Sequence, residues 1–359
     1  MDSVLYPPFD VPQDDHAGVL SQTLASSPCI KTILPAKVRS ALYNDIVLVG
    51  HSSIHLREFL PIGQLSNVIA SLEFGVQILA SKVISAEAHT IPIEDAILAN
   101  GRDEVRYKLR GHDYDDTQPP QIVVLSIASS ELVFIYARNL PTGITRFVYA
   151  KRHILGGMQW PTKYGKHLAV DPESRALAVA SAKGSFGLLA LKDVDEIKAE
   201  IDDWDPRNPT SMQPLKEQRF IQVDGVILRM DFLKTNFPEH QKVVLLLIIA
   251  NQGTTRLLLY RWSSWQPLAT VKPSKGSGYP LPSRDAFPHL LIPSCKQMSF
   301  AIMAEQRLVF YDNITSKALK RSEFVFAVRE QDKEKQWVQW AKPVRHEQHK
   351  KNKEDIFLI

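Results

Sequence analysis

The sequence predicts an all-β fold built from repeated antiparallel units, arranged as blades or as a sandwich. Five hairpins of one design recur along the 359 residues, each with an apolar run, a tight polar turn and a second apolar or aromatic run. Such runs, bounded by Gly, Asn and Ser, are typical of strands, and strands joined by short turns pair antiparallel. The hairpins are Ile46–Val49 with Ile54–Leu60, Ile122–Ile127 with Leu132–Tyr136, Ala176–Ala180 with Phe186–Leu191, Val243–Ala250 with Arg256–Trp262, and Phe300–Met303 with Arg307–Tyr311.

Composition and charge narrow the class of protein. The chain is 44% hydrophobic, enough for a large core, and its formal net charge of +4 does not predict strong field-driven binding to nucleic acid. The two cysteines, Cys29 and Cys295, are too few for a disulfide framework and favour a reducing compartment. The longest apolar stretch, Val243–Ala250, is too short to span a bilayer. We expect a soluble intracellular protein without a signal peptide.

Several stretches between the hairpins predict loops. Residues 1–29 are rich in Pro, Ser and Asp and predict a flexible leader. Charged residues and glycines crowd residues 94–120, which predicts an inserted loop. Residues 272–288 are rich in Pro, Gly and Ser, and residues 315–335 are rich in charge. Both of these predict surface excursions between the repeated units.

Three further elements follow from local patterns. Residues 68–84 alternate apolar and polar positions around Gly75, which predicts one or two strands with a bend at the glycine. Asp224-Gly225 between two apolar runs is the strongest short-range hairpin signal in the chain. Asp193 is a possible N-cap, and apolar residues of helical period follow it. We expect a short helix there, decorating the surface.

No catalytic or cofactor signature accompanies the hairpins. The glycine clusters at 184–187 and 276–278 match no phosphate-binding or nucleophile motif and predict turns. His346 and His349 share a helical spacing, but the lysines after them oppose metal binding, so a solvated basic loop is favoured. That loop lacks stacking aromatics, which disfavours specific nucleic-acid recognition. We expect no catalytic, cofactor-binding or metal-binding residues, and the partner-binding residues stay unknown.

Carboxylates and tryptophans at strand ends carry two interpretations. Propeller enzymes use acids that line a central channel, whereas aspartate at turns commonly caps backbone N–H groups, and the structural role is favoured. The candidate acids are Asp45, Glu131, Asp171, Asp224, Asp231 and Asp312. Large rings fill the wedge between neighbouring sheets, so the tryptophans are expected to pack there. They are Trp160, Trp262, Trp265, Trp337 and Trp340.

The repeat spacing is irregular, and the Gly-His pairs at 50–51 and 111–112 have no Trp-Asp at repeat distance, so the chain lacks the WD hallmark. Six segments nevertheless occur in the order found in one superfamily. They are Leu168–Ala180, Ile227–Leu233, Thr255–Trp262, Phe287–Pro293, Trp337–Arg345 and Glu354–Leu358. In these segments residues 30–359 resemble the first β-propeller of the superfamily that contains DNA-damage-binding protein 1 and the large subunit of cleavage and polyadenylation specificity factor. The nearest branch resembles the methyl-methanesulfonate-sensitivity N-terminal type domain.

The resemblance implies a seven-bladed, WD40-like β-propeller without WD motifs, and a non-enzymatic scaffold that holds other proteins in the nucleus. The first process that the resemblance implies is DNA repair, in which the protein is the adaptor of a cullin-type ubiquitin ligase. The alternative is a subunit of a pre-mRNA 3′-end processing or splicing complex with nucleic-acid binding. By strand count we expect residues 30–359 to be an incomplete propeller that ends at about blade five or six.

Two other functions stay open at this stage. Direct nucleic-acid binding requires a continuous basic stripe on one face, and a propeller hydrolase requires several acids that converge on the channel. Mixed surface charge favours the scaffold.

Overall fold

The computed structural model describes residues 29–85, 121–140, 142–154, 164–181, 184–202, 213–235, 242–264, 266–273, 278–294, 298–304, 307–312, 314, 320–325, 342–344 and 356–358. Within these residues the chain forms five antiparallel sheets of four or five strands and one two-stranded sheet. Consecutive strands pair within each sheet, so every large sheet is a meander. The predicted all-β propeller fold is confirmed, and the described sheets do not close into a ring.

Each of the first three sheets is built from four strands that are consecutive in the chain. The first sheet contains β1 (Thr32–Pro35), β2 (Asp45–Val49), β3 (Ser53–Glu58) and β4 (Ala70–Glu73). The second contains β5 (Ile78–Ser85), β6 (Gln121–Ile127), β7 (Glu131–Asn139) and β8 (Thr145–His153). The third contains β9 (Tyr164–Val170), β10 (Ala176–Ser181), β11 (Ser185–Leu191) and β12 (Leu215–Gln222).

The second half of the chain repeats the design. The fourth sheet contains β13 (Val226–Leu233), β14 (Lys242–Asn251), β15 (Thr254–Ser263), and β16 (Lys272–Pro273) and β17 (Tyr279–Pro280), which pair with different parts of β15. The fifth contains β18 (Leu290–Pro293), β19 (Phe300–Ala304), β20 (Arg307–Asp312) and β21 (Lys320–Val325). The remaining elements are β22 (Lys342–Val344), β23 (Ile356–Leu358), α3 (Val194–Asp202), and the 3-10 turns η2 (Leu268–Thr270) and η3 (Ser283–Asp285).

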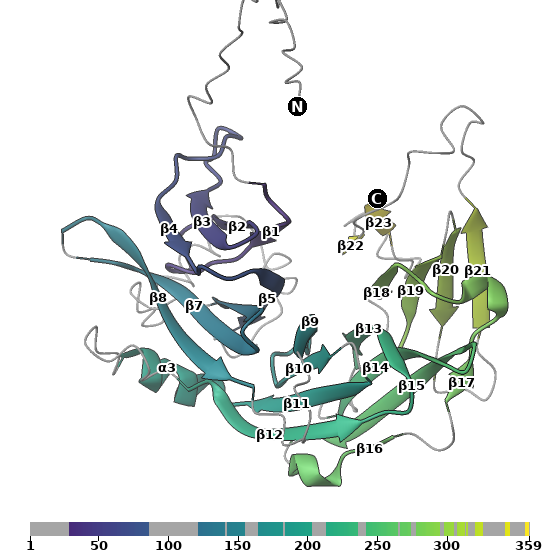
Figure 1. Ribbon diagram of the computed structural model, residues 1–359. Helices are drawn as coiled ribbons and strands as arrows, with labels where there is room; N and C mark the ends of the chain where they lie inside the picture. The colour runs from purple at the N-terminus through teal and green to yellow at the C-terminus, as the bar shows by residue number, and fades with distance from the viewer. Residues whose placement is uncertain are drawn as a thin grey trace, which may run out of the picture.

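The first strand of each large sheet is the innermost one. Strands β1, β5, β9, β13 and β18 follow one another around the inside of an arc of sheets, and each contacts the next (Figure 1). The arc is open between the first sheet and the fifth. Because each sheet begins at the inner strand and ends at the outer one, the connections between sheets run back toward the centre.

The middle strands are buried on both faces, and the two faces meet different neighbours. In β6, Ile122 and Val124 pack toward the third sheet, whereas Val123 and Leu125 pack toward the first. Strand β14 repeats the pattern, because its residues from Val243 to Ile249 alternate between the cores shared with the third and fifth sheets. A strand covered on both sides shows a continuous apolar run instead of an alternating pattern.

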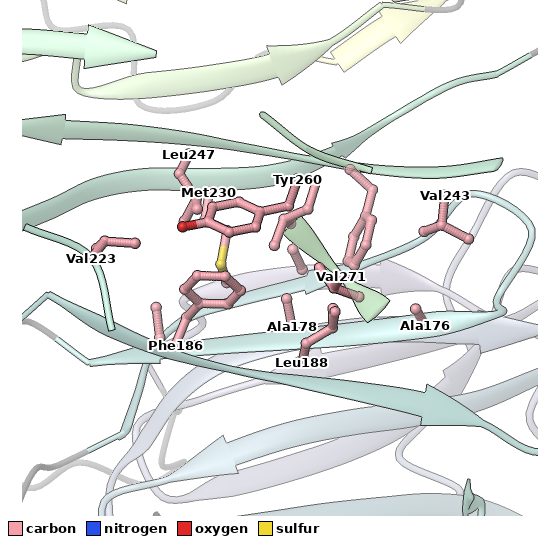
Figure 2. Packing of buried hydrophobic residues seen from close by; sticks show 14 of the residues in the cluster. Ala176, Ala178, Phe186, Leu188, Val223, Met230, Val243, Leu247, Tyr260 and Val271 are labelled. Carbon is pink, nitrogen blue, oxygen red and sulfur yellow. The ribbon is translucent and has the colours of Figure 1, made fainter. Parts of the chain in front are cut away.

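The core between the third and fourth sheets shows how the wedge is filled. Figure 2 shows Phe186 and Leu188 of β11 facing Leu247 and Tyr260 of the fourth sheet. The rings of Phe186 and Tyr260 meet edge to face, with centroids 5.0 Å apart. Trp262, the one predicted packing tryptophan among the described residues, lies in the same core against Phe232.

The five predicted hairpins are confirmed, and each supplies the second and third strands of its sheet. The bend at Gly75 is also confirmed: this residue has a φ of +67° and lies between β4 and β5. The two strands on either side of it belong to different sheets. The helix predicted after Asp193 is α3, and Glu196 accepts a hydrogen bond from the Asp193 N–H.

Four predictions from the sequence are wrong. The first is the surface excursion at 272–288, because β16 and β17 of that segment pair with β15 in the fourth sheet and Asp285 is fully buried. Asp224-Gly225 does not close a hairpin, because β12 pairs with β11 while β13 pairs with β14, and the dipeptide links two sheets. Gly225 is nevertheless required there, since its φ is +132° and a Cβ would lie 2.5 Å from the Ala250 carbonyl oxygen. The helix α3 is not mere decoration, because Ile197 and Ile201 are buried in the core of the second and third sheets.

The fourth wrong prediction is the charge-rich excursion at 315–335. Lys320–Val325 of that segment is strand β21, which pairs along β20 as an outer strand. An outer strand has one edge and much of its surface in solvent, so charged residues are compatible with pairing.

Several predictions fall outside the described residues. They include most of the leader at 1–29, the whole insertion at 94–120 and the His346–His349 stretch. The predicted incomplete ring and its blade number stay predictions. Among the described residues, no helix is long and apolar enough to cross a membrane.

We predict that Phe186→Ala lowers the free energy of unfolding by about 3–5 kcal/mol, because a fully buried ring leaves a cavity between two sheets. Phe287→Ala is the matched control, since that ring is 62% exposed, and it should change stability by less than about 0.5 kcal/mol. Urea unfolding of the full chain, followed by circular dichroism, measures both. Equal losses in the two variants would contradict the packing described here.

Candidate protein-interaction surface

The six carboxylates singled out in the sequence do not converge. They lie at the start of β2 (Asp45), the start of β7 (Glu131), the turn after β9 (Asp171), the link before β13 (Asp224), the middle of β13 (Asp231) and the end of β20 (Asp312). These positions are spread over all five large sheets. Within the described ranges, no group of three or more His, Cys, Asp or Glu residues could hold a metal ion. The arrangement supports the structural role of these acids.

Two of the acids accept hydrogen bonds from side chains at turns: Glu131 from a residue of its own turn, and Asp224 from a residue at the end of β14. Glu131 accepts a hydrogen bond from the Ser129 hydroxyl (2.7 Å), and Asp224 accepts one from the Asn251 amide (2.8 Å). A carboxylate engaged in this way orders a turn by accepting local donors.

The turn after β9 is held by Asp171, in the structural role that its place at a turn favours. The Asp171 side chain is fully buried, and its Oδ2 accepts the Arg175 Nε (2.7 Å) while its Oδ1 accepts Nη2 (2.9 Å). Ser174 has a φ of +55°, and its hydroxyl accepts the Ser85 N–H from the second sheet. Desolvation lowers the pKa of the Arg175 guanidinium, but the bonds and charge of Asp171 outweigh it, so that pKa is raised.

A second buried acid, Asp285, was not apparent in the sequence. It lies in η3, before the fifth sheet, and is fully buried. Its Oδ2 accepts the Tyr311 hydroxyl (2.6 Å) and the Arg321 Nε (2.7 Å), and its Oδ1 accepts the Arg321 Nη2 (2.7 Å). Burial opposes ionisation, but Arg321, Tyr311 and Arg307 together hold the pKa of Asp285 below its ordinary value. No sequence pattern indicated this cluster, because its members come from three separate segments.

The most conspicuous surface feature is apolar. Among the described residues nine large hydrophobic side chains are exposed, and five of them lie on two loops of the first sheet. We call these five the apolar surface of the first sheet: Leu42 (69% exposed), Phe59 (46%), Ile62 (73%), Leu65 (43%) and Val68 (45%). Leu42 lies between β1 and β2, and the other four lie between β3 and β4. Both loops leave the same end of the sheet.

Backbone hydrogen bonds fix the shape of these two loops. The Phe59 N–H donates to the Asn44 carbonyl (2.8 Å), which joins the loops to each other. Phe59 and Leu65 form an isolated antiparallel bridge, and Gly63 closes the turn between them with a φ of +81°. The exposed side chains therefore project from ordered backbone, which lowers the entropy that binding must overcome.

A buried ionic cluster lies where the two loops join strands β2 and β3. Arg39 donates through Nε to Asp45 Oδ1 (2.8 Å) and through Nη2 to Glu58 Oε2 (2.7 Å), and its guanidinium lies 3.8 Å from the centre of the Tyr43 ring. Arg39 is 8% exposed and Asp45 is 3% exposed. Desolvation lowers the pKa of Arg39, but Asp45 and Glu58 outweigh it and the pKa is raised. The cluster ties the start of β2 to the end of β3, where both loops are anchored.

Comparison with known families gives one match. Residues 29–359 match the family described as RSE1/DDB1/CPSF1 first beta-propeller. No curated protein matches the chain.

We predict that Asp285→Asn destabilises the protein by about 1.5–3 kcal/mol at neutral pH, because Arg321 and Tyr311 lose a charged acceptor. The pKa of Asp285 is lowered in the folded state, so its contribution is present above the unfolded pKa of about 3.9 and is lost as pH falls through the lower folded value. The variant should therefore lose stability less steeply than the wild type below pH of about 4.

The matched control is Asp312→Asn, which makes the same change at the end of β20. It should shift stability by less than about 0.5 kcal/mol. Urea unfolding at a series of pH values tests both variants. Parallel pH profiles for wild type and Asp285→Asn would rule out the carboxylate as the source of the dependence.

Proposed function

The chain belongs to the RSE1/DDB1/CPSF1 first beta-propeller family, and from this premise we propose that it is a non-enzymatic protein-interaction scaffold. The observation that carries the proposal is the apolar surface of the first sheet. Contiguous exposed hydrophobic side chains on a folded domain mark contact surfaces, whereas scattered ones are ordinary. Here five of the nine exposed large hydrophobic side chains of the described residues lie on two loops that a hydrogen bond joins, next to the Arg39 cluster.

The finer assignment of process is part of the same proposal. We place the protein in the nucleus, as the propeller adaptor of a cullin-type ubiquitin ligase that acts in DNA repair. The membership of the chain in a family named partly for DDB1 supports this process. The same family name also includes RSE1 and CPSF1, which supports the alternative of a pre-mRNA 3′-end processing or splicing complex.

The partners distinguish these alternatives. Affinity purification of the full chain from nuclear extract, with quantitative mass spectrometry, measures which class of complex is recovered. Cullin-ligase subunits support the first process and RNA-processing subunits support the second. Recovery of neither class, at any bait concentration, would contradict the scaffold proposal.

We predict that the double variant Ile62→Asp, Leu65→Asp loses its main protein partner, with binding reduced by about tenfold or more. Two carboxylates placed in a contact surface must be desolvated without a partner charge, and that cost opposes binding. The substitutions are at side chains 73% and 43% exposed, so the thermal midpoint should change little.

The control is Ile144→Asp, which makes the same change at a side chain 54% exposed between β7 and β8. It should leave partner recovery unchanged in the same purification. Equal recovery by the double variant and the wild type would show that the apolar surface of the first sheet is not the contact.

A further inference from the structure

One exposed aromatic residue has a strained backbone conformation. Phe287 lies in the link between η3 and β18, is 62% exposed and has a φ of +57°. This left-handed region is unfavourable for a bulky side chain. The residue before a proline is also normally extended, and Phe287 precedes Pro288. Both preferences are broken at this position.

The other residues with a positive φ do not share this combination. Among the described residues, the non-glycine residues in the left-handed region besides Phe287 are Ser130, Ser174, Gln252 and Met298. Three of them are polar, and Met298 is buried in the core between the fourth and fifth sheets. Phe287 alone combines an apolar side chain with exposure within this described set, so its ring keeps most of its surface in solvent despite the strain.

Hydrogen bonds on both sides hold the link in place. Asp285, two residues before Phe287, is fully buried and accepts the Arg321 Nε (2.7 Å). His289, two residues after Phe287, donates its N–H to a carbonyl oxygen of β19 (3.0 Å). The His289 carbonyl oxygen accepts Nε and Nη2 of Arg229 (2.9 and 2.6 Å). The surroundings therefore impose the conformation of Phe287, and its ring projects from a fixed backbone.

A fixed and exposed aromatic side chain is suited to anchor a protein interface. Aromatic residues are enriched in the core of interfaces, where a rigid ring buries a large apolar area at a small cost in rotamer entropy. A backbone that is already ordered lowers the further entropy that binding must overcome. Phe287 meets both conditions, whereas glycine would adopt the same φ without strain if only the fold required it.

The charge beside the ring restricts what it can bind. Arg284 precedes Phe287 by three residues, and its side chain is 60% exposed. Its Nη1 lies 3.7 Å from Glu323 Oε1, but Oε2 of the same carboxylate accepts Arg321 Nη2 at 2.6 Å. Glu323 is therefore held mainly by Arg321, and the Arg284 guanidinium stays in solvent with its charge only partly compensated. An apolar pocket with a carboxylate at its rim complements these two side chains.

We propose that Phe287 anchors a second protein contact, in which its ring enters an apolar pocket of a partner protein and Arg284 pairs with an acidic residue at the rim of that pocket. This contact rests on the proposed function, because a scaffold binds other proteins. It belongs to the fifth sheet, whereas the apolar surface of the first sheet lies at the other end of the open arc (Figure 1). The two contacts can therefore be tested separately.

A protein suits this site better than a nucleic acid does. Single-stranded nucleic acid binds where successive bases stack on several rings along a positive groove. The described link offers one exposed ring and one exposed arginine, and Asp285 and Glu323 place two carboxylates close to them. A pocket with one acid at its rim requires only the two groups that are present.

The test places the photocrosslinker p-benzoylphenylalanine at position 287 of the full chain, in nuclear extract. The same probe at position 62 reports on the apolar surface of the first sheet, and position 144 is the matched control, since Ile144 is 54% exposed. Mass spectrometry identifies the crosslinked residues. We expect position 287, but not 144, to crosslink to apolar residues beside an acid in one protein. A crosslink from 62 without one from 287 would overturn this contact alone, whereas crosslinks from neither would also contradict the scaffold proposal.

The crosslinked protein, once purified, allows the affinity to be measured. Phe287→Ala should raise the dissociation constant by at least about tenfold, and Arg284→Glu by at least about threefold. Lysine in place of the rim acid should restore binding to Arg284→Glu, which a merely structural role of Arg284 would not produce. Ile33→Ala changes a side chain that is 60% exposed in the first sheet, and it should leave the dissociation constant unchanged.

A second measurement tests the strain without any partner. Phe287→Gly should melt about 1 °C above Phe287→Ala, because glycine adopts a positive φ without strain. Equal melting of the two variants would refute the strained conformation. An unchanged dissociation constant in Phe287→Ala, or a crosslink from position 287 to nucleic acid in place of protein, would reject the contact itself.

Discussion

The structure depends on middle strands that bury both faces. In β6 and β14 alternate side chains belong to two different cores, one on each side of the sheet. No sheet can satisfy such a strand alone, because one of its two apolar faces would meet water. Each sheet is therefore stable only when neighbouring sheets pack against both of its apolar faces. This requirement brings the inner strands together at the centre of the arc and leaves the loops at the ends of the sheets exposed.

Buried charge is used to hold turns and links in this fold. Asp171 holds Arg175 in the turn after β9, Asp45 and Glu58 hold Arg39 at the base of the first sheet, and Asp285 joins η3 to β20 and β21. Each acid has donors close by in space, which is why burial does not leave it without compensation. Acids used in this way are not gathered into a catalytic cluster within the described residues.

Exposed loops and converging inner strands result from the same architecture. Loops at one end of the first sheet are not covered by a neighbouring sheet, and they carry exposed hydrophobic side chains on a backbone fixed by hydrogen bonds. The inner strands lie where the sheets converge, and there Lys82 of β5 forms an ion pair with Asp231 of β13. Exposed apolar side chains on an ordered backbone suit a protein that binds other proteins.

The sequence by itself determined the local elements and the family resemblance. Continuous apolar runs identified the five central hairpins, the glycine at 75 marked a break between strands, and Asp171 predicted its own turn. These signals are local, since turn chemistry and burial act within a few residues. The tertiary structure decided which strands pair. Asp224-Gly225 has a hairpin sequence, yet β13 pairs with β14, because β14 offers a longer buried face. The Asp285 cluster and the apolar surface of the first sheet join residues from separate segments of the chain, and only the tertiary structure brings them together.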